Sequence, residues 1–161
     1  MPAGSAALSG SAWRAHAGVD LAGNTFGPFT TTLPAGQYRA YFRLKTTGVL
    51  TTVLIAHLVV ITSTGGIPYI LGLHEVRGCD FRTSGQYQEM AVEFDYPRAG
   101  EQLEFRTHFP GVSDLYLDRV LIVAYPVPFA TRTVWQIGDG RCLRRCASRR
   151  SMRQATSRPM P

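Results

Sequence analysis

Residues 103–123, with the sequence LEFRTHFPGVSDLYLDRVLIV, constrain the fold more than any other stretch of the chain. Large apolar side chains alternate with polar ones over the first part of this stretch, and a period of two is the signature of a strand with one buried face. A Pro-Gly pair then indicates a turn, and a second alternating segment follows and ends in an apolar run. The stretch therefore predicts a β-hairpin. The side chains that this hairpin would turn outward together are those of Arg106, His108 and Tyr116.

The same pattern of strands and turns recurs along most of the chain. Further segments of strand length are residues 37–45, 49–61, 67–76 and 87–96. Turns rich in Gly and Pro separate them. No window combines apolar side chains at helical spacing with capping residues, so we expect no helix. Residues 1–32 are rich in Ala, Gly, Ser and Thr and predict a loose entry with one edge strand. These features predict an all-β fold, a two-sheet antiparallel β-sandwich.

The 161 residues, 45% of them hydrophobic, are enough for one domain with a substantial core. No apolar run reaches the length of a membrane span, and the first residues lack the basic and apolar segments of a signal peptide. We expect a monomer without a membrane segment. The localisation is left open, since a longer parent protein could be secreted by a signal elsewhere. The expected divisions are a flexible N-terminus at 1–12, the sandwich domain at 13–128, a linker or the start of a following module at 129–140, and a tail at 141–161.

Basic residues are concentrated at one end of the chain. Seven of the 17 lie in residues 141–161, which contain no acid, whereas the first 140 residues hold 10 basic and 11 acidic side chains. A nucleic-acid groove needs Lys and Arg clustered on a folded face, so the net charge of +6 does not indicate specific nucleic-acid binding. A segment so rich in Arg and Ser cannot bury enough apolar surface to fold. We therefore expect residues 141–161 to be a disordered tail, the product of a truncated or frame-shifted end.

Three blocks of the sequence carry a resemblance to a known family. They are GPFTTTLPAGQYRAYFRLKTT at residues 27–47, GCDFRTSGQYQEMAVEFDYP at 78–97, and the stretch at 103–123. They resemble successive strands of jelly-roll carbohydrate-binding modules of the galactose-binding-like class, over roughly residues 13–125. The resemblance implies a jelly roll that binds a polysaccharide or oligosaccharide without cleaving it, as an accessory module of a polysaccharide-active enzyme.

A second resemblance lies after the predicted sandwich. The segment TVWQIGD at residues 133–139 is similar to the W-x-I-G-x-D opening of a module in rhamnogalacturonan-lyase-like enzymes. It implies that Trp135 marks the start of a following module, and that the sandwich is the accessory domain of a larger protein.

Sugar sites combine an aromatic ring, which packs against the apolar face of a pyranose, with planar polar groups that hold adjacent hydroxyls. Residues of these types occupy outward strand positions, although a solvated sheet face would look the same. The candidate carbohydrate-binding residues are Tyr41, Arg43, Arg106, His108 and Tyr116. Trp13 is either a further stacking platform or a partly buried anchor.

Asp118 is an acid inside an apolar strand end. The resemblance implies that an acid at this place is an oxygen ligand of a structural calcium ion, with Asp20 and Asn24 as the available partners. Calcium requires six to eight oxygen ligands, more than these residues supply. A salt bridge between Asp118 and an arginine is the alternative. No other cofactor is expected.

Catalysis has little support in the sequence. The four histidines lack Cys or acidic neighbours at metal-ligand spacing, and no G-x-S-x-G motif occurs. Cys79 is isolated, and Cys142 with Cys146 lacks the second ligand pair of a zinc site. We therefore expect non-catalytic carbohydrate binding. The alternatives are a fragment of a small β-jelly-roll polysaccharide lyase or hydrolase, whose carboxylate pair only a structure can reveal, and a protein-interaction β-sandwich.

Overall fold

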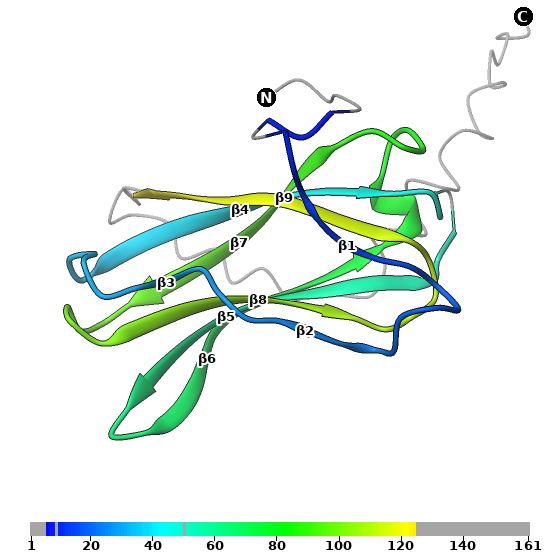
Figure 1. Ribbon diagram of the computed structural model, residues 1–161. Helices are drawn as coiled ribbons and strands as arrows, with labels where there is room; N and C mark the ends of the chain where they lie inside the picture. Colours follow the sequence, from blue (N-terminus) through cyan, green and yellow to red (C-terminus); the bar gives the residue numbers. More distant parts are fainter. Residues whose placement is uncertain (1–5, 9, 50, 125–161) are drawn as a thin grey trace, which may run out of the picture.

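Two antiparallel sheets pack face to face in the computed structural model, which describes residues 6–8, 10–49 and 51–124 (Figure 1). The first sheet has the strand order β1-β9-β4-β7, and the second has the order β2-β8-β5-β6 with β3 also paired to β8. The strands are β1 (Trp13–Ala15), β2 (Gly23–Thr25), β3 (Phe29–Thr30), β4 (Gly36–Thr46), β5 (Leu54–Thr64), β6 (Ile67–Arg77), β7 (Gln88–Tyr96), β8 (Gln102–Phe109) and β9 (Leu115–Ala124). The predicted two-sheet β-sandwich is confirmed. The predicted linker and tail at 129–140 and 141–161 lie outside the described residues.

The core lies between the sheets and is built from alternate residues of the strands. On β4 the buried apolar side chains include Phe42 and on β8 they include Phe105, and both belong to one cluster. Phe94 of β7 joins them, with its ring edge-on to that of Phe105 at a centroid distance of 5.9 Å. Alternation in sequence therefore correctly identified the inward faces of these strands.

The predicted hairpin at residues 103–123 is wrong, although both of its strands form. β8 pairs with β5 in the second sheet, whereas β9 pairs with β4 in the first. The connection between β8 and β9 thus crosses from one sheet to the other (Figure 1). Alternation specifies which face of a strand is buried, but not which strand lies beside it. Consequently Arg106 and His108 lie on the outer face of one sheet, and Tyr116 lies on the outer face of the other.

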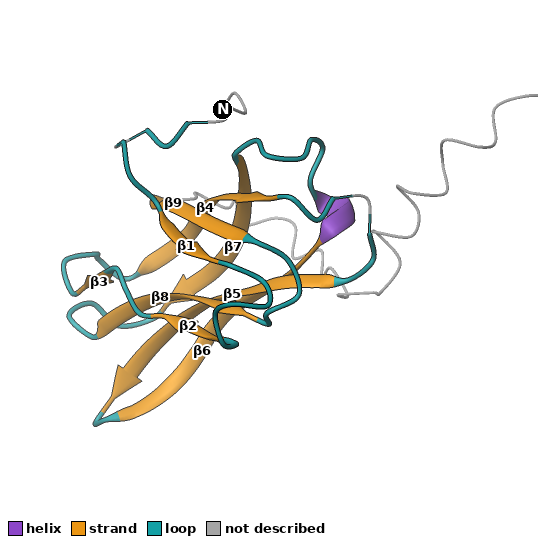
Figure 2. Ribbon diagram, turned by 45° about the vertical axis from the view of Figure 1, so that its right-hand side comes forward, coloured by secondary structure: helices purple, strands orange, loops and turns teal. Residues whose placement is uncertain are grey.

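Four smaller features also differ from the sequence predictions. The expected entry with one edge strand contains the three short strands β1, β2 and β3, and the segment expected to start at residue 49 becomes a strand only at Leu54. A short 3-10 turn, η1 (Gly78–Asp80), lies between β6 and β7 in a region predicted as loop (Figure 2). Cys79 in this turn is buried and disulfide-bonded, so the expectation that it is isolated is wrong.

The two sides of the sandwich differ. On one side β6 lies against β7, and a Cβ added at Gly72 would lie only 2.7 Å from Val92 Cγ1 and 2.8 Å from the carbonyl oxygen of Glu93. His74 Nδ1 also lies 2.8 Å from the carbonyl oxygen of Ala91. On the other side, β1 pairs with only the first three residues of β9. Among the described residues, no helix is long and apolar enough to span a bilayer.

Candidate functional site

The outer face of the second sheet brings polar and aromatic side chains together from four strands. The pairing registers align Asn24 of β2, His108 of β8, His57 of β5 and Glu75 of β6 in one row across the sheet. The next row contains Arg106, Val59 and Leu73. We call this surface the β8 face; it is formed by Asn24, Phe26, His57, Glu75, Glu104, Arg106 and His108.

The guanidinium of Arg106 is held in a fixed orientation on the β8 face. Its Nε and Nη2 atoms each donate a hydrogen bond of 2.7 Å to Glu104, one to each carboxylate oxygen. This charge-assisted pair raises the pKa of Arg106. The guanidinium carbon also lies 5.1 Å from the centre of the Phe26 ring, and Phe26 is 65% exposed. The remaining donors of Arg106 and an accessible aromatic ring are therefore available to one ligand.

The two histidines of the β8 face form a stacked pair. The rings of His57 and His108 lie 5.6 Å apart at an interplanar angle of 24°. His108 Nδ1 lies 3.2 Å from Asn24 Oδ1, and His57 Nε2 lies 3.8 Å from a carboxylate oxygen of Glu75. Each ring is thus positioned by a side chain of the strand on its far side. The result is a continuous line of planar polar groups across the sheet.

The other three predicted site residues lie on the opposite face of the sandwich. Tyr41 and Arg43 are on β4 and Tyr116 is on β9, all pointing away from the core of the first sheet. Arg43 is only 5% exposed, because its guanidinium covers the buried Tyr87 ring at 4.4 Å and bonds to Asp118. The predicted set of five is therefore split between two surfaces, and Arg43 is not accessible to a polysaccharide.

The acids proposed as calcium ligands are engaged elsewhere. Asp118 accepts a bond of 2.5 Å from Arg43 and bonds from the backbone N–H of Leu8 at 3.3 and 3.2 Å. Asp20 accepts a bond of 2.7 Å from the backbone N–H of His16. Within the described part of the chain, no group of three or more His, Cys, Asp or Glu side chains could hold a metal ion. The alternative of a salt bridge to an arginine is what the geometry of Asp118 shows, and these residues do not fit calcium.

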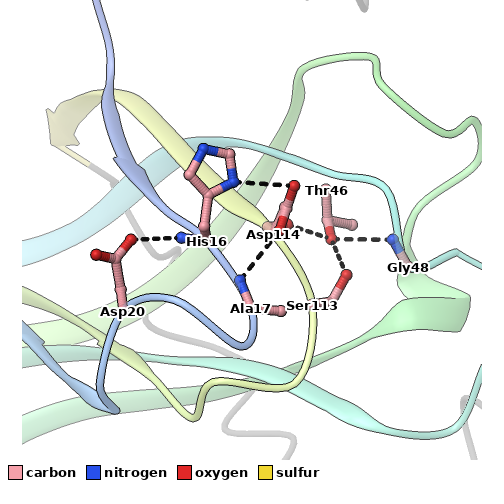
Figure 3. A network of polar contacts seen from close by, with 7 residues as sticks. All are labelled: His16, Ala17, Asp20, Thr46, Gly48, Ser113 and Asp114. Carbon is pink, nitrogen blue, oxygen red and sulfur yellow. Dashed lines mark hydrogen bonds and ion pairs between the residues drawn. The ribbon is translucent and has the colours of Figure 1, made fainter.

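A polar network joins the loops at one end of the sandwich (Figure 3). Asp114 accepts a hydrogen bond of 3.0 Å from the backbone N–H of Ala17 and pairs with His16 Nδ1 at 3.2 Å. These contacts lower the pKa of Asp114. The neighbouring Ser113 hydroxyl points to Thr46, whose Oγ1 lies 3.0 Å away, rather than to His16 (Figure 3). These hydrogen bonds therefore hold the loops together and do not form a nucleophile-base-acid triad.

Alternation found two residues of the β8 face and missed its other members. Arg106 and His108 stand at outward positions of a strand that was correctly recognised. His57 carried a signal, because it interrupts an otherwise apolar strand. Phe26 carried no signal, since its place beside Arg106 depends on the pairing of β2 with β8.

Comparison with known proteins gives structural similarities only, since no family model and no curated protein matches the chain. One similar solved structure is TmCBM61 in complex with β-1,4-galactotriose, at 12% identity and a TM-score of 0.35 over 63% of this chain and 61% of that chain. Another contains the CBM22-1 and GH10 modules of Clostridium thermocellum endo-1,4-β-D-xylanase 10B with xylohexaose, at 16% identity and a TM-score of 0.38 over 64% and 20%. A family 16 carbohydrate-binding module matches at 13% identity and a TM-score of 0.43 over 71% and 77%. The chain thus spans about three fifths of the first and one fifth of the second.

Proposed function

We propose that this protein is a non-catalytic carbohydrate-binding module and that it binds a polysaccharide on the β8 face. The observation that carries the proposal is the fixed guanidinium of Arg106 beside the exposed ring of Phe26. A pyranose has an apolar face that an aromatic ring can cover and adjacent hydroxyls that planar donors can bind in pairs. Both requirements are met at one point of an open sheet surface.

The row of polar groups next to Arg106 extends the surface across the sheet. Asn24, His108 and His57 supply amide and imidazole groups that can donate to or accept from hydroxyls. Because these side chains contact one another before any ligand arrives, little side-chain entropy is lost on binding. An extended sugar chain crossing the strands would meet several such groups in succession, which favours an oligosaccharide or polysaccharide over a monosaccharide.

The proposal is tested by titrating the protein against a panel of plant and bacterial polysaccharides that includes β-1,4-galactan and xylan. We expect saturable binding to at least one of them. Phe26→Ala should weaken that binding by roughly tenfold, and should leave the melting temperature nearly unchanged because the ring is 65% exposed. The matched control is Tyr41→Ala, which removes an aromatic ring from the opposite sheet. Binding that survives Phe26→Ala unchanged would place the ligand elsewhere.

A product assay on the responsive polysaccharide separates binding from cleavage. We expect neither new reducing ends nor unsaturated products after prolonged incubation with the parent protein. Release of either product would favour the alternative of a small polysaccharide hydrolase or lyase. If no polysaccharide binds, the carbohydrate function is contradicted, and a protein-interaction sandwich becomes the better explanation.

A further inference from the structure

A pocket lies beside β1 and the middle of β9. β1 pairs with Leu115–Leu117 of β9 and goes no further along that strand, which continues to Ala124. Before Trp13 the chain no longer pairs with β9 along the backbone, but the Leu8 N–H still donates to the carboxylate of Asp118 on β9. The space between these segments is a pocket of about 430 Å³. Its lining residues are Ser11, Ala12, Trp13, Pro28, Leu117, Asp118, Arg119 and Val120.

The size and the walls of this pocket suit a small ring with one apolar face. The volume lies within the range of about 300–1,000 Å³ that small-molecule sites occupy. Pro28, Leu117 and Val120 supply apolar surface, and Ser11 and Arg119 are polar members of the lining. The carboxylate of Asp118 contributes little to ligand contacts, because Arg43 and the Leu8 N–H already occupy it.

Trp13 is the residue that gives this pocket a specific chemistry. Its side chain is 40% exposed although it stands in a strand that pairs with β9. The sequence left open whether Trp13 is an anchor or a stacking platform, and an indole that lines a pocket with this exposure fits the platform. An indole offers a large apolar face together with an N–H donor, the combination that sugar rings require.

The pocket borders the β8 face across one short segment. Phe26 contacts Arg106 on the β8 face, and Pro28, two residues later, lines the pocket. Pro28 is fixed to the second sheet, since its carbonyl oxygen accepts a hydrogen bond of 3.2 Å from the backbone N–H of Phe105. The segment from Phe26 to Pro28 thus contributes one residue to the β8 face and one to the pocket lining.

We infer that the Trp13 pocket is a second sugar subsite, which binds one pyranose residue of the polysaccharide held by the β8 face, with the indole stacked on the apolar face of that sugar. The inference rests on the proposed carbohydrate binding and extends it from the sheet face to the open side of the sandwich. It assigns to Trp13 a direct ligand contact.

The test uses Trp13 as its own reporter. The sequence contains two tryptophans, so the Trp135→Phe variant leaves Trp13 as the only one. We expect its fluorescence to change, and its quenching by acrylamide to fall, when the responsive polysaccharide or its short oligosaccharides are added. This readout leaves every described lining residue of the pocket in place and does not depend on the stability of a Trp13 variant.

Affinity measurements complete the test. Trp13→Ala should weaken polysaccharide binding by roughly fivefold to tenfold, and Trp13→Phe should restore part of the loss because it keeps a ring. The matched control is Tyr69→Ala, which removes an exposed ring from β6 on the far side of the sandwich. Melting curves of each variant show whether a loss of affinity reflects unfolding.

The outcomes separate this inference from the proposed function. Suppose that Phe26→Ala weakens binding, that the ligand does not change Trp13 fluorescence, and that Trp13→Ala binds like the parent. The subsite is then contradicted, and binding on the β8 face is supported. If the ligand changes Trp13 fluorescence and Phe26→Ala does not change the affinity, binding in the pocket is supported and binding on the β8 face is contradicted. If no polysaccharide alters Trp13 fluorescence or binds to the parent, both are overturned.

Discussion

Two buried threonines show that the contribution of a hydroxyl group to stability depends on its hydrogen-bond partners. Thr46 and Thr107 are both fully buried, at 0% exposure. Thr46 Oγ1 donates to the carbonyl oxygen of Asp114 at 2.7 Å and accepts from the backbone N–H of Gly48 at 3.2 Å. Thr107 Oγ1 has no hydrogen-bond partner among the described residues. A buried hydroxyl without a partner costs free energy, whereas a bonded one contributes to stability.

Replacing each threonine by the isosteric valine should therefore have opposite effects. Thr107→Val should raise the free energy of unfolding by about 1 kcal/mol, because an unsatisfied hydroxyl is removed from the core. Thr46→Val should lower it by about 1–3 kcal/mol, because it leaves the Gly48 N–H and the Asp114 carbonyl without their partner. Urea denaturation of the two variants measures both changes. Equal losses in the two variants would contradict this explanation.

At the level of single residues, the sequence predicted well which side chains point away from the core, but it predicted their solvent exposure poorly. Arg43 does point outward from β4, as alternation predicts. Its burial comes from Tyr87 and from the backbone carbonyl of Ala6, which accepts a hydrogen bond from Arg43 at 3.3 Å. Contacts between segments so distant in sequence leave no trace in the local pattern, so the loss of Arg43 as a binding residue could not be predicted.

At the level of strands, the structure depends on close approaches that glycine permits. Gly72 lets β6 lie against β7, and an added Cβ would overlap both a side chain and the backbone of β7. Gly72→Ala should therefore lower the free energy of unfolding by about 1–3 kcal/mol, as in an overpacked core. The melting temperature should fall accordingly. The matched control is Gly36→Ala on β4, where the added Cβ would meet only ordinary contacts at 3.5 Å and beyond. Calorimetry should show a small change for Gly36→Ala, and similar losses in both variants would contradict the packing argument.

The loops at one end of the sandwich give a prediction about pH. The Ala17 N–H, the His16 side chain and the charge of Arg14 lower the pKa of Asp114 from its ordinary value of 3.8. A lowered pKa means that the stabilisation is present above the ordinary value and is lost as pH falls through the folded value. Asp114→Asn should therefore lower the melting temperature at neutral pH. The difference from the parent should shrink below about pH 3.8, and a difference that stays constant into acid would contradict this assignment.

The change of sheet between β8 and β9 explains why Tyr116 lies apart from Arg106 and His108, beside which the predicted hairpin would place it. Both strands are amphipathic, and a hairpin or a crossover would bury the same side chains. The Pro-Gly signal at residues 110–111 marks a turn in either arrangement. Strand pairing depends on contacts with β4 and β5, whose paired residues lie 39 or more positions earlier in the chain. The local sequence therefore predicted the strands but not their partners.

For the whole molecule, the spacing of strands and turns was enough to predict a two-sheet sandwich. Each amphipathic strand must bury one face, and packing two sheets together satisfies all of them at once. The β8 face emerges only from this arrangement, because its members come from β2, β5, β6 and β8 and from Phe26, which directly follows β2. Arg106 and His108 were predicted correctly as outward residues of one strand, whereas their union with Phe26 and His57 is a property of the sheet.

The most direct test of the β8 face compares Arg106→Ala with Tyr116→Ala. The hairpin predicted from sequence would place both residues in one site, whereas the structure places them on opposite faces of the sandwich. Binding to the responsive polysaccharide, measured by isothermal titration calorimetry at a temperature where both variants remain folded, should weaken roughly tenfold or more for Arg106→Ala. It should stay at the parent value for Tyr116→Ala. Equal losses in the two variants, or a loss in Tyr116→Ala alone, would contradict binding on the β8 face.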